Sequence, residues 1–363
     1  MSTASGFLAD PAITVEAPAW RERWQDRLAR GAGIFSVLGL GFIVPLLRIA
    51  IGEPLQPQLK ELWRSCGIPL AAFLLFLGAW GLLAPRVKTS LGVLPGPAQV
   101  WQQAENLWAD HRAERAKERA FYERQEKRNA EVRATDRTAE VKVRPYTGAP
   151  TYIDQIVTSL ETVFTGFVFA TLAAVPLGVL CGLSPTVNTA INPLVQIFKP
   201  VSPLAWLPLV TMVVSALYVS SDPLLPKSFL ISAITVTLCS LWPTLINTAL
   251  GVASIDKDLV NVGRVLRLPW HSKLTKIVLP SALPLIFTGL RLSLGVGWMV
   301  LIAAEMLAQN PGLGKFVWDE FQNGSSESLA KIMVAVFTIG IIGFVLDRIM
   351  LALQAAFTHG VTR

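Results

Sequence analysis

Apolar residues in this chain gather into long runs that polar and charged stretches separate. Seven runs occur, at about residues 31–51, 67–85, 155–183, 201–220, 228–252, 282–308 and 329–354. A helix needs about 20 apolar residues to cross the hydrocarbon core of a bilayer. No Asp, Glu, Lys or Arg occurs at 162–198, 200–221 or 228–255, so each of these stretches can hold at least one span. The pattern predicts an all-α, polytopic membrane protein.

The runs also predict how the chain is divided. We expect an N-terminal extension with one apolar run (1–60), then a first core span and an interfacial helix (61–108). A charged insert (109–150), a core of five spans (151–356) and a tail (357–363) follow. The interfacial helix is expected because Trp101 and Trp108 lie on one face, as in a helix at a membrane surface. The insert, with eleven Lys/Arg and eight Asp/Glu between 110 and 144, predicts a solvated helix or a flexible tether.

A basic segment at 256–281 separates the fifth and sixth runs. Apolar residues recur there at helical spacing, as Leu259, Val262, Val265 and Leu266 and then as Leu274, Ile277 and Val278. Since a proline stops a helix, the segment predicts two short amphipathic helices joined by a turn at Leu268-Pro269. On the cytoplasmic face such a unit is a docking surface for a soluble partner; the alternative is an amphipathic linker at the membrane surface. If it is cytoplasmic, the charged stretch 87–153 lies outside, and the side of the N-terminus stays open.

Composition agrees with a membrane protein. The hydrophobic fraction is 52%, charged residues make up 16%, and the mean hydropathy is +0.49, whereas soluble domains carry about a quarter charged residues. The net charge of +7 does not indicate nucleic acid, because Lys and Arg mark cytoplasmic loops and lipid headgroup contacts in such proteins. Cys66, Cys181 and Cys239 lie far apart, so we expect neither a metal nor a redox site.

Proline and glycine are frequent inside the apolar runs, most densely in KPVSPLAWLP at 199–208. Broken backbone at membrane depth is tolerated where other protein or a water-filled cavity satisfies the freed polar groups. The breaks therefore favour a helix bundle around a pathway over a simple anchor.

From residue 159 onward the chain resembles the transmembrane core of the type I ABC importer permeases. The resemblance rests on the runs 159–182, 202–214, 241–252 and 279–307, taken in order, and on PGLGKFVWDEFQNGSS at 311–326. The basic segment is similar to the family's EAA loop, which grips the ATPase, and Ile277-Val278-Leu279-Pro280 closes it. Within the family, TGLRLSLGVGW at 288–298 and GLGKFVWDEFQNGSS at 312–326 look most like nitrate permeases, whose relatives move cyanate or bicarbonate.

The EAA-like segment departs from the family pattern at two places. Asn261-Val262-Gly263 stands where Glu-Ala-Ala is usual, and Arg267 stands where glycine is usual. We expect Arg267 to avoid a left-handed turn, because its side chain disfavours that conformation. The docking residues that the resemblance implies are Leu259, Asn261, Val262, Gly263, Arg264, Arg267, Leu268, Pro269, Ile277, Leu279 and Pro280.

The resemblance also implies partners and a location. These are separate ABC ATP-binding subunits, a second permease copy in a homodimer, a periplasmic or lipid-anchored solute receptor, and membrane lipid in the bacterial inner membrane. We expect no catalysis and no cofactor in this chain, with ATP and Mg²⁺ in the partner subunits. Indeed GLGKF at 312–316 lacks the first glycine and the hydroxyl of a phosphate-binding loop. The alternatives are a permease for another small anion (cyanate, bicarbonate, sulfonate or taurine) and, in a different class, a secondary transporter or channel.

Four residues inside the spans are pathway candidates: Arg291, Trp298, Glu305 and Trp206. Charged groups there cost about 2.5–3.5 kcal/mol each, so each is a functional candidate. Arg291 contacts an anion, extends its side chain to the cytoplasmic surface of the membrane, or holds a helix–helix contact. Glu305 would repel an anion, which favours a structural or gate role near the outer mouth. Asp347 and Arg348 are expected to contact headgroups or to pair within their helix.

Overall fold

The computed structural model describes residues 41–52, 54–89, 92–135, 143–219, 224–325 and 327–358, with the backbone alone at Lys257. The chain divides into two compact units, 1–73 and 74–363. Within the described residues the strands are β1 (Lys88–Thr89) and β2 (Gly92–Val93), an antiparallel pair of two residues each. Almost everything else is helical, which confirms the all-α prediction.

The first unit holds short helices in the described residues. They are α2 (Ile43–Ala50), α3 (Leu55–Leu62), a π turn (Trp63–Gly67) and the start of α4 (Ile68–Leu83). Arg48 and Glu61 form an exposed ion pair at 3.5 Å. The predicted apolar run at 31–51 lies mostly outside the described residues, and its described end forms the eight residues of α2.

Among the residues that the structure describes, five helical stretches are long and apolar enough to cross a membrane. They are Leu55–Arg86, which closes with a 3₁₀ turn (Ala84–Arg86), then α6 (Tyr152–Leu183), α9 (Lys227–Ala253), Trp270–Ala308, which ends in α12 (Leu279–Ala308), and α14 (Ser328–Thr358). The predicted span at 201–220 forms only α8 (Pro203–Leu217), which at about 22 Å is too short to cross alone. Together with α7 (Pro185–Phe198) it makes a pair bent by 102° that can count as a sixth span. The prolines that we expected to break the helices are the reason for this difference.

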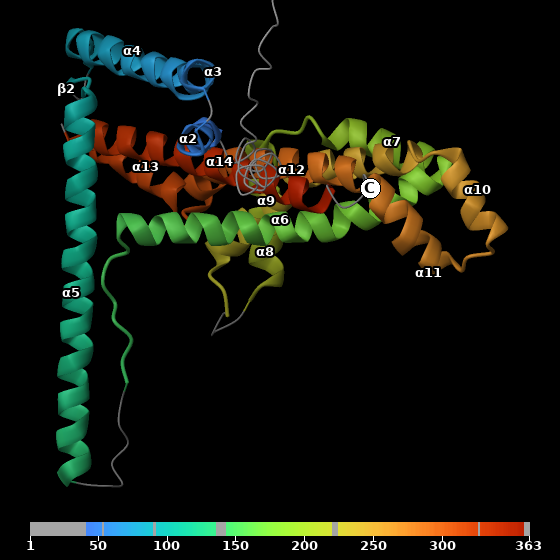
Figure 1. Cartoon of the computed structure of the whole chain (residues 1–363). Coiled ribbons are helices and arrows are strands. Elements are labelled where there is room, and N and C mark those ends of the chain that lie inside the picture. Colours follow the sequence, from blue (N-terminus) through green and yellow to red (C-terminus); the bar gives the residue numbers. More distant parts are fainter. Residues whose placement is uncertain are drawn as a thin grey trace, which may run out of the picture. The chain divides into compact units, whose positions relative to one another are not determined.

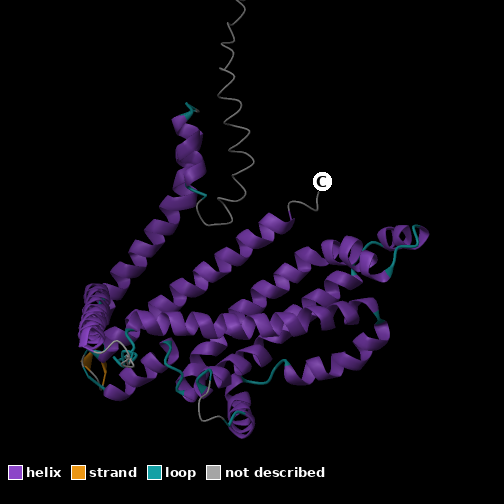
Figure 2. Ribbon diagram, turned by 90° about the horizontal axis from the view of Figure 1, so that it is seen from below, coloured by secondary structure: helices purple, strands orange, loops and turns teal. Residues whose placement is uncertain are grey.

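Small residues explain why α6 and α9 pack closely. Gly166, Ala170, Ala174, Gly178 and Gly182 recur every fourth residue along α6 and form one stripe. A Cβ added at Gly178 would lie 2.6 Å from a Thr248 side-chain atom, so the stripe lets the backbones approach. The close contact extends from Gly166, beside Val236, to Gly182, beside Val252. Figure 2 shows long helices of the bundle running side by side.

Hydroxyl groups also fasten α12 to α9. The Ser293 hydroxyl donates to the Ser240 carbonyl oxygen at 2.5 Å and accepts from the Thr244 backbone N–H at 3.0 Å. Both serines and Thr244 are fully buried. Inside a membrane, such bonds satisfy polar groups that lipid cannot.

The charged insert is a long helix rather than a separate element. Helix α5 (Pro97–Thr135) contains both the predicted interfacial helix and most of the insert. The chain returning at 143–151 is bonded along it: the Tyr146 hydroxyl donates to Glu114 at 2.7 Å, and the Arg144 backbone N–H donates to Gln125 at 2.9 Å. The flexible-tether alternative is therefore wrong for the described part. Figure 1 shows α5 across the end of the bundle where α6 begins, and α10 (Lys257–Val265) and α11 (Trp270–Lys273) beyond the other end.

Candidate docking elbow and membrane pathway

The segment 256–281 is a helical elbow, as the sequence predicts. Helix α10 begins at the N-cap Asp256, whose carboxylate accepts from the Asp258 backbone N–H at 2.9 Å. After the turn at Leu268-Pro269, α11 leads through a π turn (Leu274–Val278) directly into α12. The elbow is therefore joined to a membrane span without a loop.

Arg267 closes the first helix in a left-handed conformation. Its φ is +48°, and the Leu268 backbone N–H donates to the Gly263 carbonyl oxygen at 3.1 Å. This is the bonding pattern of a helix that ends on a left-handed residue, usually glycine. The expectation that Arg267 avoids such a turn is wrong, because the bond closing the helix holds the arginine there.

Gly263 sets how closely the two arms of the elbow approach. A Cβ added there would lie 2.9 Å from the Ile277 Cδ1 atom. The next residues along the chain, Val278 and partly buried Leu279, pack against Val179 and Ile286 of the bundle. Pro280 occupies the first turn of α12. The second amphipathic stripe thus faces inward and anchors the elbow.

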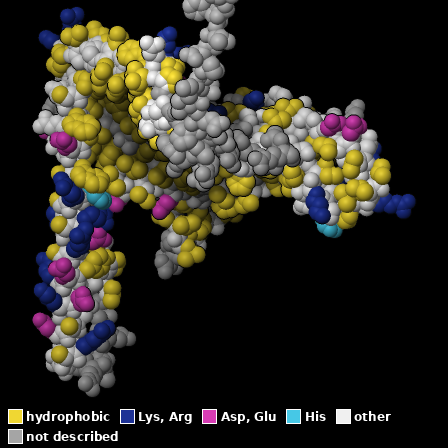
Figure 3. Space-filling model, viewed as in Figure 1, with side chains coloured by type: hydrophobic (Ala, Val, Ile, Leu, Met, Phe, Trp, Pro, Cys, Tyr) yellow, Lys and Arg dark blue, Asp and Glu magenta, His cyan; other side chains and the backbone are white. Residues whose placement is uncertain are grey.

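The stripe of the first helix faces outward. The exposed fractions of Leu259, Val262 and Val265 are 47%, 52% and 81%. Asn261, Val262 and Val265 line a shallow groove of about 380 Å³. Arg264 lies beside it, with its guanidinium 3.5 Å from the Asn261 side-chain oxygen. Figure 3 shows hydrophobic and charged side chains side by side at this end of the molecule. An apolar helix face bordered by charge is suited to lie in the groove of another protein.

Arg291 on α12 pairs with Asp347 on α14. Its Nε and Nη2 atoms donate to the two carboxylate oxygens at 2.5 and 3.0 Å. Asp347 therefore pairs across helices, unlike the predicted headgroup contact or pair within its own helix, while the Arg348 guanidinium lies over the Phe344 ring. A cavity of about 240 Å³ opens beside the pair, and Trp298, whose indole N–H donates to the Ile339 carbonyl oxygen at 3.0 Å, lines it. The geometry favours the helix–helix role of Arg291, and its contact with an anion stays a prediction.

Glu305 is fully buried at the junction of three helices. The Ser159 hydroxyl of α6 lies 2.8 and 2.9 Å from its two oxygens, and the Gly314 backbone N–H donates to it at 2.9 Å. Ser159 also accepts from the Leu313 backbone N–H at 2.8 Å. Helix α13 (Leu313–Asn323) starts at Gly312, which has no side chain to cap it, so Glu305 and Ser159 supply the acceptors. These contacts support the structural role of Glu305.

Trp206 lies near the bend between α7 and α8. Its ring is 5.7 Å from that of Phe198, and its buried indole N–H has no acceptor among the described residues. Sequence reasoning missed the residue beside this contact, Lys199. It is the sole Lys, Arg, Asp, Glu or His between positions 162 and 221, and that isolation was the available signal.

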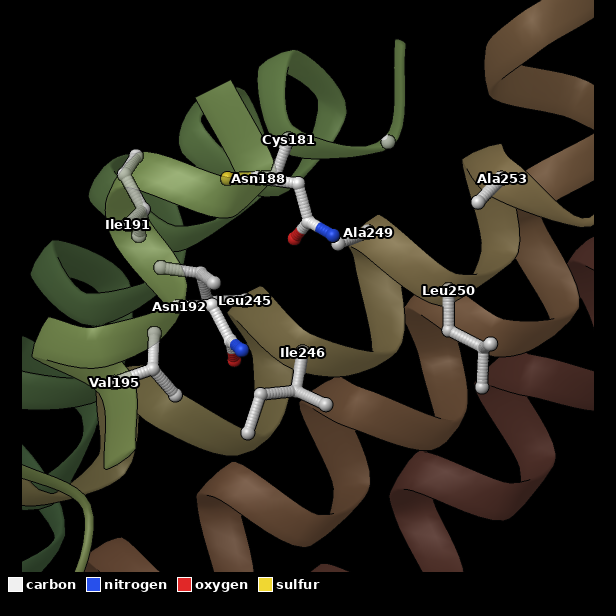
Figure 4. A pocket seen from close by; sticks show the side chains of 11 residues that line it. Cys181, Asn188, Ile191, Asn192, Val195, Leu245, Ile246, Ala249, Leu250 and Ala253 are labelled. Atoms are coloured by element: carbon white, nitrogen blue, oxygen red, sulfur yellow. The ribbon is translucent and has the colours of Figure 1, made fainter. Parts of the chain in front are cut away.

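A second cavity, of about 230 Å³, lies between α6, α7 and α9. Figure 4 shows the Asn188 and Asn192 amide groups of α7 directed toward the α9 side of this space. The rest of its wall is mainly apolar, with Leu245 and Ala249 of α9.

Comparison with protein families gives a match over residues 174–362, to the binding-protein-dependent transport system inner membrane component family. The match covers 189 of 363 residues, more than half of the chain. The chain belongs to this family. It is thus an ABC importer permease with several membrane-spanning helices, as the type I resemblance predicted.

Comparison with individual relatives shows which members of the family the chain resembles. The chain is 35% identical over 196 residues to the nitrate import permease of Leptolyngbya laminosa, covering 54% of this chain and 65% of that protein, just under two thirds. It is 39% identical over 201 residues to the bicarbonate transport permease of Synechococcus elongatus, covering 55% and 67%. A probable ABC transporter permease of Brucella melitensis is 29% identical over 293 residues, covering 81% and 96%. The nitrate and bicarbonate likeness agrees with the predicted subfamily.

Proposed function

We propose that this permease is the pathway subunit of an ATP-driven importer of a small oxyanion, nitrate in the first place. Two copies surround one pathway in a bacterial inner membrane. Two ATP-binding subunits, holding ATP and Mg²⁺, dock on the cytoplasmic side, and an external receptor delivers the anion. This chain itself performs no covalent chemistry.

The observation that carries the docking step is the outward apolar face of α10. Leu259, Val262 and Val265 leave roughly half or more of their surface exposed on a nine-residue helix. The charge-rich end formed by α5 lies at the opposite end of the bundle (Figure 1), which supports the proposal that the elbow and α5 face opposite sides of the membrane. Its partner in this proposal is a soluble protein with an apolar groove.

Continuity of the helix supports a mechanical role for the elbow. The stretch Trp270–Ala308 runs from α11 into the full length of α12. Closure of the ATP-binding subunits would move α10. The movement would reach α12 through the turn at 266–269 and the close approach of Gly263 to Ile277, because no loop separates α11 from α12. Rigid-body movement of the bundle then opens the pathway to each side in turn.

Bicarbonate is the second candidate substrate, favoured by the relative that is 39% identical. Cyanate and sulfonates such as taurine stay possible within the same mechanism. A secondary transporter or channel would differ in a measurable way, because its transport would not depend on ATP-binding subunits.

The test uses the complex reconstituted in vesicles. Val262→Glu and Arg264→Glu should abolish ATP-dependent nitrate uptake while insertion in the membrane stays normal, because each places a charge where docking needs apolar or basic surface. Val132→Glu on α5 is the matched control, since Val132 is also exposed, at 41%. Normal uptake by both elbow variants would remove the docking proposal. If the complex hydrolyses ATP at equal rates with nitrate-loaded and with empty receptor, nitrate is rejected as the substrate. The same measurement is then made with bicarbonate.

A further inference from the structure

Lys199 lies at the break between two half-length helices. Helix α7 ends at Phe198, and the Lys199 backbone N–H still donates to the Val195 carbonyl oxygen at 3.0 Å. Pro200 has no N–H to continue the ladder, and α8 begins at Pro203 after a bend of 102°. The lysine is therefore held at the last helical position before the bend.

The break lies near the middle of the bundle. Phe198 stacks on Trp242 of α9, with ring centroids 6.2 Å apart and planes 10° apart. Trp242 has 14 residues without Asp, Glu, Lys or Arg before it in the chain, from 228, and 13 after it, to 255. At 1.5 Å a residue this is about 20 Å to either side. A cation at that depth is costly unless it has a functional or structural partner.

Lys199 has no such partner within the described part of the chain. It forms no ion pair there, and its side chain is exposed. Arg291 differs, because Asp347 already neutralises it in a two-bond pair. Of these two cations within spans, Lys199 is the one whose charge is available.

The surroundings of the break offer hydrogen-bond donors. The indole N–H groups of Trp206 and Trp242, which both pack on Phe198, have no acceptor among the described residues. On α7, Asn192 precedes Lys199 by seven residues, which places both on one helix face about 10 Å apart. Asn192 lines the cavity of Figure 4, and Asn188 lies one turn nearer the cytoplasmic end. Between 162 and 221 no Asp or Glu occurs to repel an anion.

We propose that Lys199 is the mid-depth contact for the transported anion, and that Asn192 and Asn188 line its path toward the cytoplasm. The ligand class is a small oxyanion, which accepts hydrogen bonds and donates few or none. Neutral amides below the lysine would guide such an ion without retaining it. This inference rests on the proposed import function and adds the residues that select the cargo.

The first test compares charge variants in the reconstituted complex. Lys199→Met should reduce the ratio kcat/KM for nitrate uptake at least about tenfold, while Lys199→Arg retains most of it, since the cation is kept. Lys227→Met, at the outer start of α9, is the matched control and should change little. Receptor-stimulated ATP hydrolysis should persist in Lys199→Met, because the elbow is intact.

The second test restores the charge chemically. Lys199→Cys is made in a chain whose three native cysteines are replaced by alanine. The new thiol is then modified with a methanethiosulfonate reagent that attaches either a cationic ethylammonium group or a neutral methyl group. Uptake should recover with the cationic reagent and not with the neutral one. Recovery with both, or unchanged uptake in Lys199→Met, would overturn the inference. Absence of ATP-dependent nitrate uptake by the wild-type complex would instead count against the proposed function.

Discussion

Replacing Glu305 by leucine removes the acceptor shared by two buried donors, the Ser159 hydroxyl and the Gly314 backbone N–H. A buried donor left unsatisfied costs about 1–3 kcal/mol, so the first turn of α13 should lose about 2–6 kcal/mol of local stability. Glu305→Gln should lose less, because its carbonyl oxygen still accepts from Gly314. At 1.4 kcal/mol for each factor of ten, the lower bound is about a thirtyfold change in the opening equilibrium.

Hydrogen exchange measured by mass spectrometry reads this equilibrium directly. The peptide containing Leu313 and Gly314 should exchange at least about thirtyfold faster in Glu305→Leu than in the wild type. Ser159→Ala should shift it in the same direction, since Leu313 also donates to that hydroxyl. Glu161→Leu, which changes an exposed acid on the same helix, is the control. Exchange at the wild-type rate in both Glu305→Leu and Ser159→Ala would refute the capping role of these residues.

Two further predictions concern the elbow and α5. Arg267→Gly should stabilise the elbow by about 1 kcal/mol, because glycine adopts the left-handed turn without the penalty that arginine bears. Arg267→Ala is the control: it also removes the charge but keeps the penalty, so it should not stabilise the elbow. Equal unfolding midpoints for the two variants would contradict the reasoning. The hydrogen bond from the Tyr146 hydroxyl lowers the pKa of Glu114 below its ordinary 4.5, and the same bond to Glu114 raises the pKa of Tyr146. The bond therefore adds stability above pH 4.5 that is lost as the pH falls through the lowered pKa. Amide protection factors at 143–151, which correct for the intrinsic slowing of exchange in acid, should therefore fall in acid for the wild type and not for Tyr146→Phe.

Local patterns in the sequence predicted the local structure well. Pro269 and the apolar spacing on either side of it were enough to predict the elbow, because a proline and a helical period act within a few residues. The charge-free runs likewise predicted the spans of α6 and α9, and the apolar run at 329–354 predicted that of α14. The density of prolines at 199–208 predicted a break, though not that α7 and α8 would form one pair of short helices bent by 102°.

Contacts between distant residues could not be predicted in this way. The pairing of Arg291 with Asp347 joins positions 56 apart, and that of Ser159 with Glu305 joins positions 146 apart. Neither carboxylate carries a local signal of its partner. The left-handed Arg267 was missed for another reason: intrinsic preference favours glycine there, and the bond from Leu268 to Gly263 outweighs that preference.

The most direct test of the account asks which protein contacts α10. Val265, the most exposed apolar residue of that helix at 81%, is replaced by cysteine in the cysteine-free chain, and cross-linking to single-cysteine ATP-binding subunits is followed with and without nucleotide. The account predicts a cross-linked product that depends on Val265→Cys, is absent with cysteine at Val132 of α5, and changes in yield when ATP binds. Two results together would contradict the account: a membrane-impermeant reagent labels the Val265→Cys thiol from outside intact cells, and no cross-linked product forms between Val265→Cys and the ATP-binding subunits.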